Sequence, residues 1–113
     1  MAGKNYDDDN VFAKIIRGDL PAKMVAESPH AMAFHDVRPA ARTHVLVVPK
    51  GPYGTMADFI DRAPAGEQAD FWNLVMAAAE KSNVRDNFRL TVNTGAGAGQ
   101  TVPHFHAHIL SDK

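Results

Sequence analysis

Cysteine is absent from this chain of 113 residues. Its absence excludes disulfides and thiolate metal sites, and nothing in the composition indicates an oxidising compartment. Long apolar runs are absent too: none is long enough to cross a membrane, and the first residues lack the apolar core of a signal peptide. We therefore expect a soluble, cytoplasmic protein that does not interact with a membrane.

An excess of charge of one sign is also missing. The chain has 12 basic and 13 acidic residues, which give a formal net charge of −1. Proteins that bind long nucleic acids usually carry a basic stripe on their surface. We therefore expect no long nucleic acid among the partners.

The length is that of one compact domain, which can bury a core without disulfides. The first ten residues are mostly polar and end in Asp7-Asp8-Asp9-Asn10. We expect residues 1–10 to form a flexible segment whose last residues can cap a helix. Residues 11–113 are expected to form a single domain, because no internal repeat indicates a second one.

Apolar periodicity and turn residues predict a mixture of helices and strands. Helices are expected from Val11 to Gly18 and over residues 55–63 and 66–82. Strands are expected over residues 23–28, 31–36, 44–48 and 88–93, with a fifth near the C-terminus. Short turns join several strands, which favours an antiparallel α+β fold over a doubly wound parallel sheet.

Three histidines occupy alternate positions in the run His104-Phe105-His106-Ala107-His108. Alternate residues of a strand point to one face, so the three imidazoles are expected to share a face opposite Phe105 and Ala107. Imidazole can act as a nucleophile, acid, base or metal ligand near neutral pH. The pattern alone leaves three interpretations open: a polar solvent-facing strand, a metal site, or a covalent catalytic site.

The metal interpretation needs a third ligand, which could be His44 or His108, because no cysteine is available and no nearby carboxylate is obvious. In the covalent interpretation an imidazole nitrogen attacks phosphorus. Neighbouring imidazoles would then hold the phosphoryl oxygens or protonate the leaving group.

A glycine-rich segment precedes the histidines. Gly95, Gly97 and Gly99 permit positive φ angles and a close approach of backbone amides to an anion, although a plain flexible connection has the same composition. The segment is not a P-loop, because the Lys-Ser/Thr ending is missing. Gln100 and Thr101 offer an amide and a hydroxyl to a phosphate or a leaving group.

Asp36 lies at the end of a predicted strand, where its carboxylate could accept both hydroxyls of a ribose or could simply stabilise a turn. Asn93 could bind a phosphate or fix the turn into the glycine-rich segment. His35 is either a substrate-binding residue or a plain surface residue.

The run from His104 to Leu110 resembles the His-φ-His-φ-His-φ-φ signature of the histidine triad (HIT) family. Four segments in the N-terminal half resemble the Hint branch of that family in order and spacing: residues 11–16, 21–23, 33–37 and 44–50. Residues 99–102 also fit the pattern before the triad, but the Fhit-type branch shares that stretch.

This resemblance implies a five-stranded antiparallel sheet with two main helices, and a homodimer in which two sheets join. It implies hydrolysis or transfer at the α-phosphate of purine nucleoside substrates, without a metal or another cofactor. Hint-type members usually act on nucleoside phosphoramidates. Two alternatives stay open: a dinucleoside polyphosphate hydrolase, and a nucleotide-binding regulatory dimer with little catalysis.

The resemblance also implies roles for individual residues. His106 would be the nucleophile, with its other ring nitrogen held by a backbone carbonyl, and His104, His108 and His44 would surround it. Asp36 would bind the ribose, with His35 beside it. The phosphate would be surrounded by Asn93, Gly99, Gln100 and Thr101. The base pocket would be formed by Val11, Phe12, Ile15, Phe34, Val37 and Leu46.

Two features depart from the pattern of the Hint branch. The chain ends at Lys113, whereas many members of the branch continue into a tail that approaches the partner's site and affects the leaving group. Pro103 directly precedes His104 and removes a backbone donor, so the last strand is expected to begin there or to lie at a sheet edge.

Overall fold

The strands form one antiparallel sheet in a computed structural model that describes residues 6–113. The strands are β1 (Met24–Glu27), β2 (Ala31–His35), β3 (Thr43–Pro49), β4 (Arg89–Thr91) and β5 (Ala107–Ser111). Their order across the sheet is β1-β2-β3-β5-β4. The helices are α1 (Val11–Arg17), α2 (Met56–Arg62) and α3 (Ala65–Lys81), and a short 3₁₀ turn, η1, spans Ala96–Ala98. Within the described residues the expected α+β fold is confirmed.

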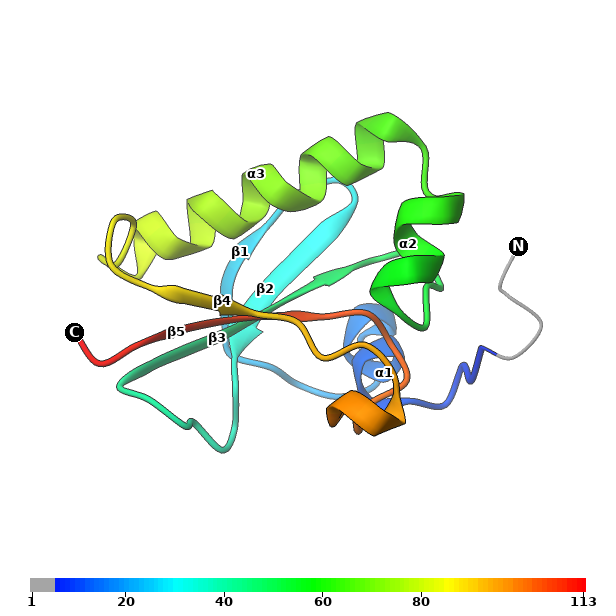
Figure 1. Cartoon of the computed structure of the whole chain (residues 1–113), viewed down its shortest axis with the longest axis horizontal. Coiled ribbons are helices and arrows are strands. Elements are labelled where there is room, and N and C mark those ends of the chain that lie inside the picture. The colour runs from blue at the N-terminus through cyan, green and yellow to red at the C-terminus, as the bar shows by residue number, and fades with distance from the viewer. Residues whose placement is uncertain (1–5) are drawn as a thin grey trace.

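Helices cover both faces of the sheet, as Figure 1 shows. Helix α3 packs on one face over the main core, which includes Val45 and Val47 of β3. Helix α1 packs on the other face, where Phe12 joins a second cluster with Leu46. Because successive strand residues point to opposite faces, β3 directs His44 and Leu46 to the α1 face. The histidine chemistry therefore lies on the face that α1 covers.

Helix α1 begins and ends where its sequence predicts. The Asn10 side chain accepts a hydrogen bond from the Ala13 amide, which caps the first turn. Gly18 ends the helix in the left-handed conformation, with φ of 84°. Of the segment expected to be flexible, residues 1–5 lie outside the described residues. Residues 6–10 connect directly to α1 and reach the site described below.

The last strand is shorter than expected. It begins at Ala107, so it contains His108 but neither His104 nor His106. The expectation that all three histidines lie on one strand is therefore wrong. The expectation that Pro103 marks the strand start or a sheet edge is also wrong, because β5 lies between β3 and β4. Strand β4 is likewise shorter than the predicted 88–93.

Pro49 explains where β5 begins. The last β3–β5 pair joins Val47 to Ala107, and the same register would place Pro49 opposite Phe105 two residues further on. Proline has no N–H to continue the ladder. The Phe105 amide instead donates to the Tyr53 carbonyl at 2.8 Å. In the segment before β5, side chains still point alternately to the two faces of the sheet. Phe105 packs against Phe59 on the face that α3 covers.

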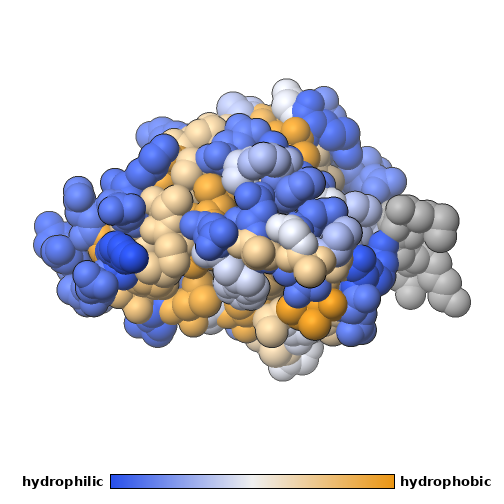
Figure 2. Space-filling model, turned by 90° about the horizontal axis from the view of Figure 1, so that it is seen from above, coloured by the Kyte–Doolittle hydropathy of each residue, from blue (hydrophilic) through white to orange (hydrophobic). Residues whose placement is uncertain are grey.

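The outer surface on the α3 side mixes hydrophilic and apolar residues (Figure 2). Met76 of α3 is one of the larger apolar side chains exposed to solvent. Among residues 6–113, no helix combines the length and the hydropathy needed to cross a bilayer.

Candidate active site

Three histidines and one carboxylate meet on the α1 face of the sheet. His44 of β3 and His108 of β5 are hydrogen-bonded, with His44 Nε2 at 2.9 Å from His108 Nδ1. The His106 ring lies 5.0 Å from the His108 ring between centroids. Asp36, just after β2, places Oδ2 at 3.4 Å from His44 Nε2. Strand pairing brings these residues together, because β2, β3 and β5 are adjacent in the sheet.

A backbone hydrogen bond fixes the tautomer of His106. Its Nδ1 lies 2.7 Å from the His104 carbonyl oxygen, which can only accept, so Nδ1 carries the proton. Nε2 then keeps its lone pair. His106 as a whole is only 6% exposed, but every fully buried side-chain nitrogen or oxygen among residues 6–113 has a partner. No hydrogen-bond partner of His106 Nε2 is found among these residues, so this atom is not fully buried.

The pKa of His106 is lowered from its ordinary value, chiefly because the ring is buried. The His104 carbonyl and the Asp36 charge act in the opposite direction and do not outweigh burial. The ring is therefore neutral at neutral pH, with its lone pair on Nε2. That is the protonation state in which an imidazole is nucleophilic.

A second backbone group sets the tautomers of His44 and His108. The Ala40 amide donates to His44 Nδ1 at 3.0 Å, so the His44 proton lies on Nε2 and is donated to His108 Nδ1. His108 consequently carries its own proton on Nε2. Burial, followed by the charges of His106 and His44, lowers the pKa of His108 to about 4. His108 thus offers a neutral N–H beside the His106 lone pair.

His104 occupies a different position from the other triad members. Its side chain is 0% exposed, and both ring nitrogens have partners. Nε2 donates to the Pro49 carbonyl at 2.8 Å, and Nδ1 accepts from the Tyr6 hydroxyl at 2.6 Å. Burial lowers the pKa of His104 to about 4. The His104 ring therefore has no free nitrogen for a ligand. His104 is hydrogen-bonded to His106 through its backbone carbonyl.

An apolar cavity of about 350 Å³ lies between α1 and the sheet. Its lining includes His35 and Asp36. It also contains all six residues expected to form a base pocket: Val11, Phe12, Ile15, Phe34, Val37 and Leu46. The Phe12 ring also contacts the His106 ring edge-on, with centroids 4.8 Å apart. One side chain of the pocket wall therefore contacts the predicted nucleophile.

Four lining residues were missed by the sequence reasoning: Leu20, Pro21, Ala22 and Val102. Three of them, Pro21, Ala22 and Val102, lie in segments that resemble the family. The resemblance therefore indicated these segments, but it assigned no role to these three residues. Leu20 follows the glycine that ends α1, and nothing in the local pattern indicates that it turns back towards the sheet.

A broader cavity of about 760 Å³ continues from the apolar one. The two share Pro21, Ala22, His35, Asp36 and Val37. The broader cavity also reaches His44, and it adds two basic residues, Lys23 and Arg42. The apolar pocket therefore opens at Asp36 into a wider, more polar hollow.

Asp36 forms a turn and also lines both cavities. Oδ1 accepts from the Arg38 amide at 2.7 Å, which is the hydrogen bond of a turn. Oδ2 lies near His44, and the residue lines both cavities. A turn-forming aspartate can thus also present acceptor lone pairs to a ligand.

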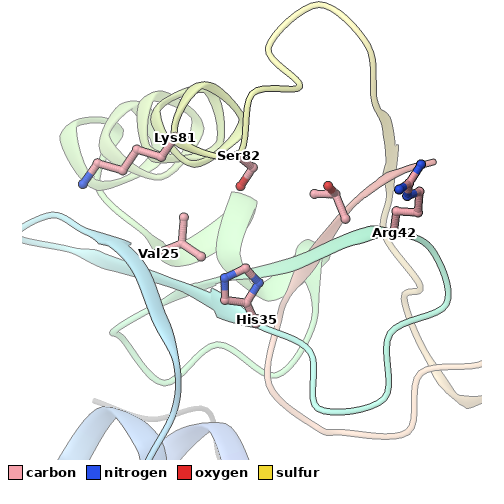
Figure 3. A pocket seen from close by; sticks show the side chains of 6 residues that line it. Val25, His35, Arg42, Lys81 and Ser82 are labelled. Atoms are coloured by element: carbon pink, nitrogen blue, oxygen red, sulfur yellow. The ribbon is translucent and has the colours of Figure 1, made fainter. Parts of the chain in front are cut away.

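His35 lies at the end of β2 on the opposite side from the cluster. Pleating puts its side chain on the same face as Ala31 and Ala33, which belong to the α3 core. A small hollow of about 310 Å³ lies there, where His35 faces Val25 and Ser82 (Figure 3). The structure does not bring the His35 ring into the group formed by His44, His106 and His108.

The glycine-rich segment is held by its own polar side chains. Gln100 accepts from the Gly95 amide at 2.8 Å and donates to the Gly54 and Val102 carbonyls. Asn93 donates to the Ala98 carbonyl at 2.9 Å. Gly95 and Gly99 have φ of 87° and 90°, but Gly97 is not among the residues with positive φ. Gln100 and Asn93 thus shape the loop, while Thr101 is exposed.

Asp36, His44 and His108 could in principle hold a metal ion, since one ligand atom from each lies within 4.8 Å of the others. The sequence reasoning saw no carboxylate near the histidines, and the structure corrects that. The Ala40 amide opposes coordination, however, because its donation to Nδ1 leaves the His44 proton on Nε2. A cation would need the lone pair of that atom, so the observed bonds favour a chain of donors over a metal site.

A five-stranded antiparallel sheet with clustered histidines beside an apolar pocket is the arrangement of a histidine triad protein. A sequence model of the family described as "HIT domain" matches residues 17–113. The chain therefore belongs to the HIT family. It is 44% identical over 111 residues to an uncharacterised 13.2 kDa HIT-like protein from Azospirillum brasilense, covering 97% of this chain and 91% of the relative.

Solved structures show the same fold. A HIT family hydrolase from Legionella pneumophila superposes with a TM-score of 0.84 at 32% identity, covering 93% of this chain and 94% of the other. A HIT family hydrolase from Clostridium thermocellum gives 0.83 at 34% identity, covering 93% and 91%. These names identify the family as one of the hydrolase type.

Proposed function

We propose that the protein is a Hint-type nucleotidyl hydrolase that cleaves purine nucleoside phosphoramidates at the α-phosphate and releases a nucleoside monophosphate. The observation that carries this proposal is the neutral His106 ring, whose Nδ1 proton is held by the His104 carbonyl and whose Nε2 lone pair has no partner among residues 6–113. The neighbouring apolar cavity of about 350 Å³ supports a nucleoside substrate.

In the proposed complex the base enters the apolar pocket between Phe12 and Leu46. The ribose hydroxyls bind Asp36 at the pocket's polar end. The α-phosphate then lies between His106 Nε2 and the Nε2–H of His108, which donates to a phosphoryl oxygen. The 5.0 Å between these two rings supports this placement.

The proposed reaction has two steps. In the first, His106 Nε2 forms a bond to the α-phosphorus and the bond from phosphorus to the amine breaks, so that the amine leaves with a proton from solvent. In the second, water attacks the phosphorus and gives up a proton to solvent, and the bond to Nε2 breaks, which restores neutral His106. The His104 carbonyl stabilises the positive ring that exists between the steps, because it accepts from Nδ1–H.

The direct test replaces the nucleophile. We expect His106→Asn to bind a nucleoside monophosphate as the wild type does and to lose several orders of magnitude in turnover of an adenosine phosphoramidate. Amine release and calorimetric binding measure the two quantities. Unchanged turnover in the variant would refute the assignment of His106.

Two alternatives are separated by the substrate panel of the same assay. A dinucleoside polyphosphate hydrolase would turn over a dinucleoside polyphosphate faster than the phosphoramidate. A regulatory nucleotide-binding protein would bind the monophosphate without turning over either substrate.

We also propose that two copies form a homodimer by joining their sheets, and that the protein is cytoplasmic. Strand β4 is a sheet edge, and Leu90 within it is exposed. An open strand edge can pair with a second copy. Light scattering during size-exclusion chromatography checks this proposal, and a monomer at micromolar concentration would contradict it.

A further inference from the structure

The Tyr6 hydroxyl completes a chain of hydrogen bonds behind the histidine cluster. It lies 2.6 Å from His104 Nδ1 and accepts from Asn10 Nδ2 at 3.1 Å. The other nitrogen of His104 reaches the Pro49 carbonyl, and the His104 carbonyl holds His106. The chain thus runs from the cap of α1 to the predicted nucleophile.

The direction of every hydrogen bond in this chain is determined by its fixed ends. The Pro49 carbonyl can only accept, so the His104 proton lies on Nε2 and Nδ1 must accept. The Ala13 amide donates to Asn10 Oδ1, which places the Asn10 amino group towards Tyr6. Tyr6 therefore accepts from Asn10 and donates its own proton to His104. Neutral His104 is the only form that fits these partners.

We propose that Tyr6 is a positioning residue for His106, acting through His104; this rests on the function proposed above. Tyr6 and Pro49 hold the His104 ring at both nitrogens, which fixes the carbonyl that orients His106 and keeps its Nδ1 protonated. The hydrogen bond from Tyr6 also favours neutral His104, because protonation of Nδ1 would break it and require the Tyr6 hydroxyl to turn and accept. No positive charge then forms behind the nucleophile.

The same chain joins the base pocket to the nucleophile. Asn10, which donates to Tyr6, also caps α1. That helix carries Phe12, whose ring contacts both His104 and His106. Tyr6 therefore links the position of the pocket helix to the position of His106, which a purely local packing role would not require.

Tyr6→Phe tests the proposal, with Tyr53→Phe as the matched control. Each variant removes one hydroxyl and keeps the ring. The Tyr53 hydroxyl donates to Glu67 at 3.3 Å, and its ring belongs to the core beneath α3. We expect Tyr6→Phe to slow transfer of the nucleotide to His106 by about tenfold in a single turnover, the effect of one lost hydrogen bond. Binding of a nucleoside monophosphate should stay within about twofold of the wild type, and Tyr53→Phe should not slow the transfer.

Two readouts report positioning and not general stability. In Tyr6→Phe the acid limb of the rate profile should move to higher pH, because His104 Nδ1 becomes free to take a proton. The ¹⁵N signal of His104 Nδ1 should change, whereas it should not in Tyr53→Phe. A fluorinated tyrosine at position 6 keeps the hydroxyl as a stronger donor and should leave the His104 ring neutral over the same pH range as the wild type.

Equal transfer rates, pH profiles and His104 signals in the two phenylalanine variants would overturn the proposal. A loss of unfolding free energy in Tyr6→Phe without any change in rate or in the His104 signal would overturn it as well. If the wild type turns over no phosphoramidate, the proposed function fails. The His104 signal then still decides whether Tyr6 sets the protonation of that ring.

Discussion

His106 and His108 are two residues apart, yet hydrogen bonds give their rings opposite tautomers. The His104 carbonyl keeps the His106 proton on Nδ1, and the Ala40 amide, acting through His44, keeps the His108 proton on Nε2. One ring therefore presents a lone pair and the other presents an N–H. Two residues of the same type can in this way take the roles of nucleophile and hydrogen-bond donor.

At this scale the family resemblance predicted which residues meet and that a backbone carbonyl holds the other ring nitrogen of His106, which the structure confirms, but it did not predict the tautomers of His44 and His108. The spacing of the triad and its resemblance to the family indicated His44, Asp36 and the pocket residues, and the structure brings these together. The tautomers depend on single backbone groups, such as the Ala40 amide, whose direction no side-chain pattern encodes. Tyr6 was missed for a similar reason, since its partner His104 is 98 residues away.

The role of Asp36 can be separated from its role in the turn. Asp36→Asn keeps an oxygen that can accept from the Arg38 amide but removes the charge. We expect the affinity for a nucleoside monophosphate to fall by about tenfold, because the amide is a weaker acceptor for the ribose hydroxyls. Calorimetry with the ribo and 2′-deoxy monophosphates measures this.

The control for Asp36→Asn is the ligand itself. If Asp36 binds the ribose, the variant should discriminate less between the ribo and 2′-deoxy compounds than the wild type does. Identical discrimination by both proteins would mean that Asp36 serves the turn alone.

Helices and strands follow closely from local pattern, and the exceptions have local causes. Asn10 and Gly18 predict the ends of α1, and the structure confirms both. The extent of β5 could not be predicted from alternation, because the strand stops where Pro49 on the neighbouring strand cannot continue the ladder. Alternation describes the direction of side chains, and it persists in an extended segment without strand pairing.

The cap of α1 should affect both stability and the site. We expect Asn10→Ala to lower the free energy of unfolding by about 1 kcal/mol and to weaken nucleotide binding, because α1 forms one wall of the pocket. Urea denaturation and calorimetry measure the two effects.

Thr55→Ala provides the matched control, since Thr55 caps α2 through the Asp58 amide. It should lower stability by a similar amount and leave nucleotide binding unchanged. Equal weakening of binding in both variants would show that α1 has no special connection to the site.

Across the whole molecule, the site is built from both ends of the chain. Tyr6 and α1 come from the N-terminal part and His104, His106 and His108 from the C-terminal part, and the sheet between them places β3 beside β5. The family resemblance predicted this arrangement correctly as a five-stranded sheet. Periodicity and turn residues alone had already indicated five strands in an antiparallel α+β fold.

Burial of several neutral histidines makes the stability of the whole fold depend on pH. The pKa of His104 and that of His108 are lowered from 6.5 to about 4, so the unfolded chain binds more protons between these values. The stabilisation is fully present above pH 6.5 and is lost as the pH falls towards about 4.

Urea unfolding at pH 7.5 and at about pH 5.5 checks this expectation in a range above the titration of ordinary carboxylates. The free energy of unfolding should be lower at the acidic value. A value that is equal or higher there would mean that these histidines are not buried in neutral form.

The central claim is that His106 takes the nucleotide covalently. Mixing the protein with a slowly hydrolysed nucleoside phosphoramidate, quenching, and mass spectrometry of the peptides measures it most directly. The account predicts a nucleotidyl adduct on the peptide that contains His106, absent from His106→Asn. Turnover by the wild type with no adduct on His106, or with the adduct on another residue, would contradict it.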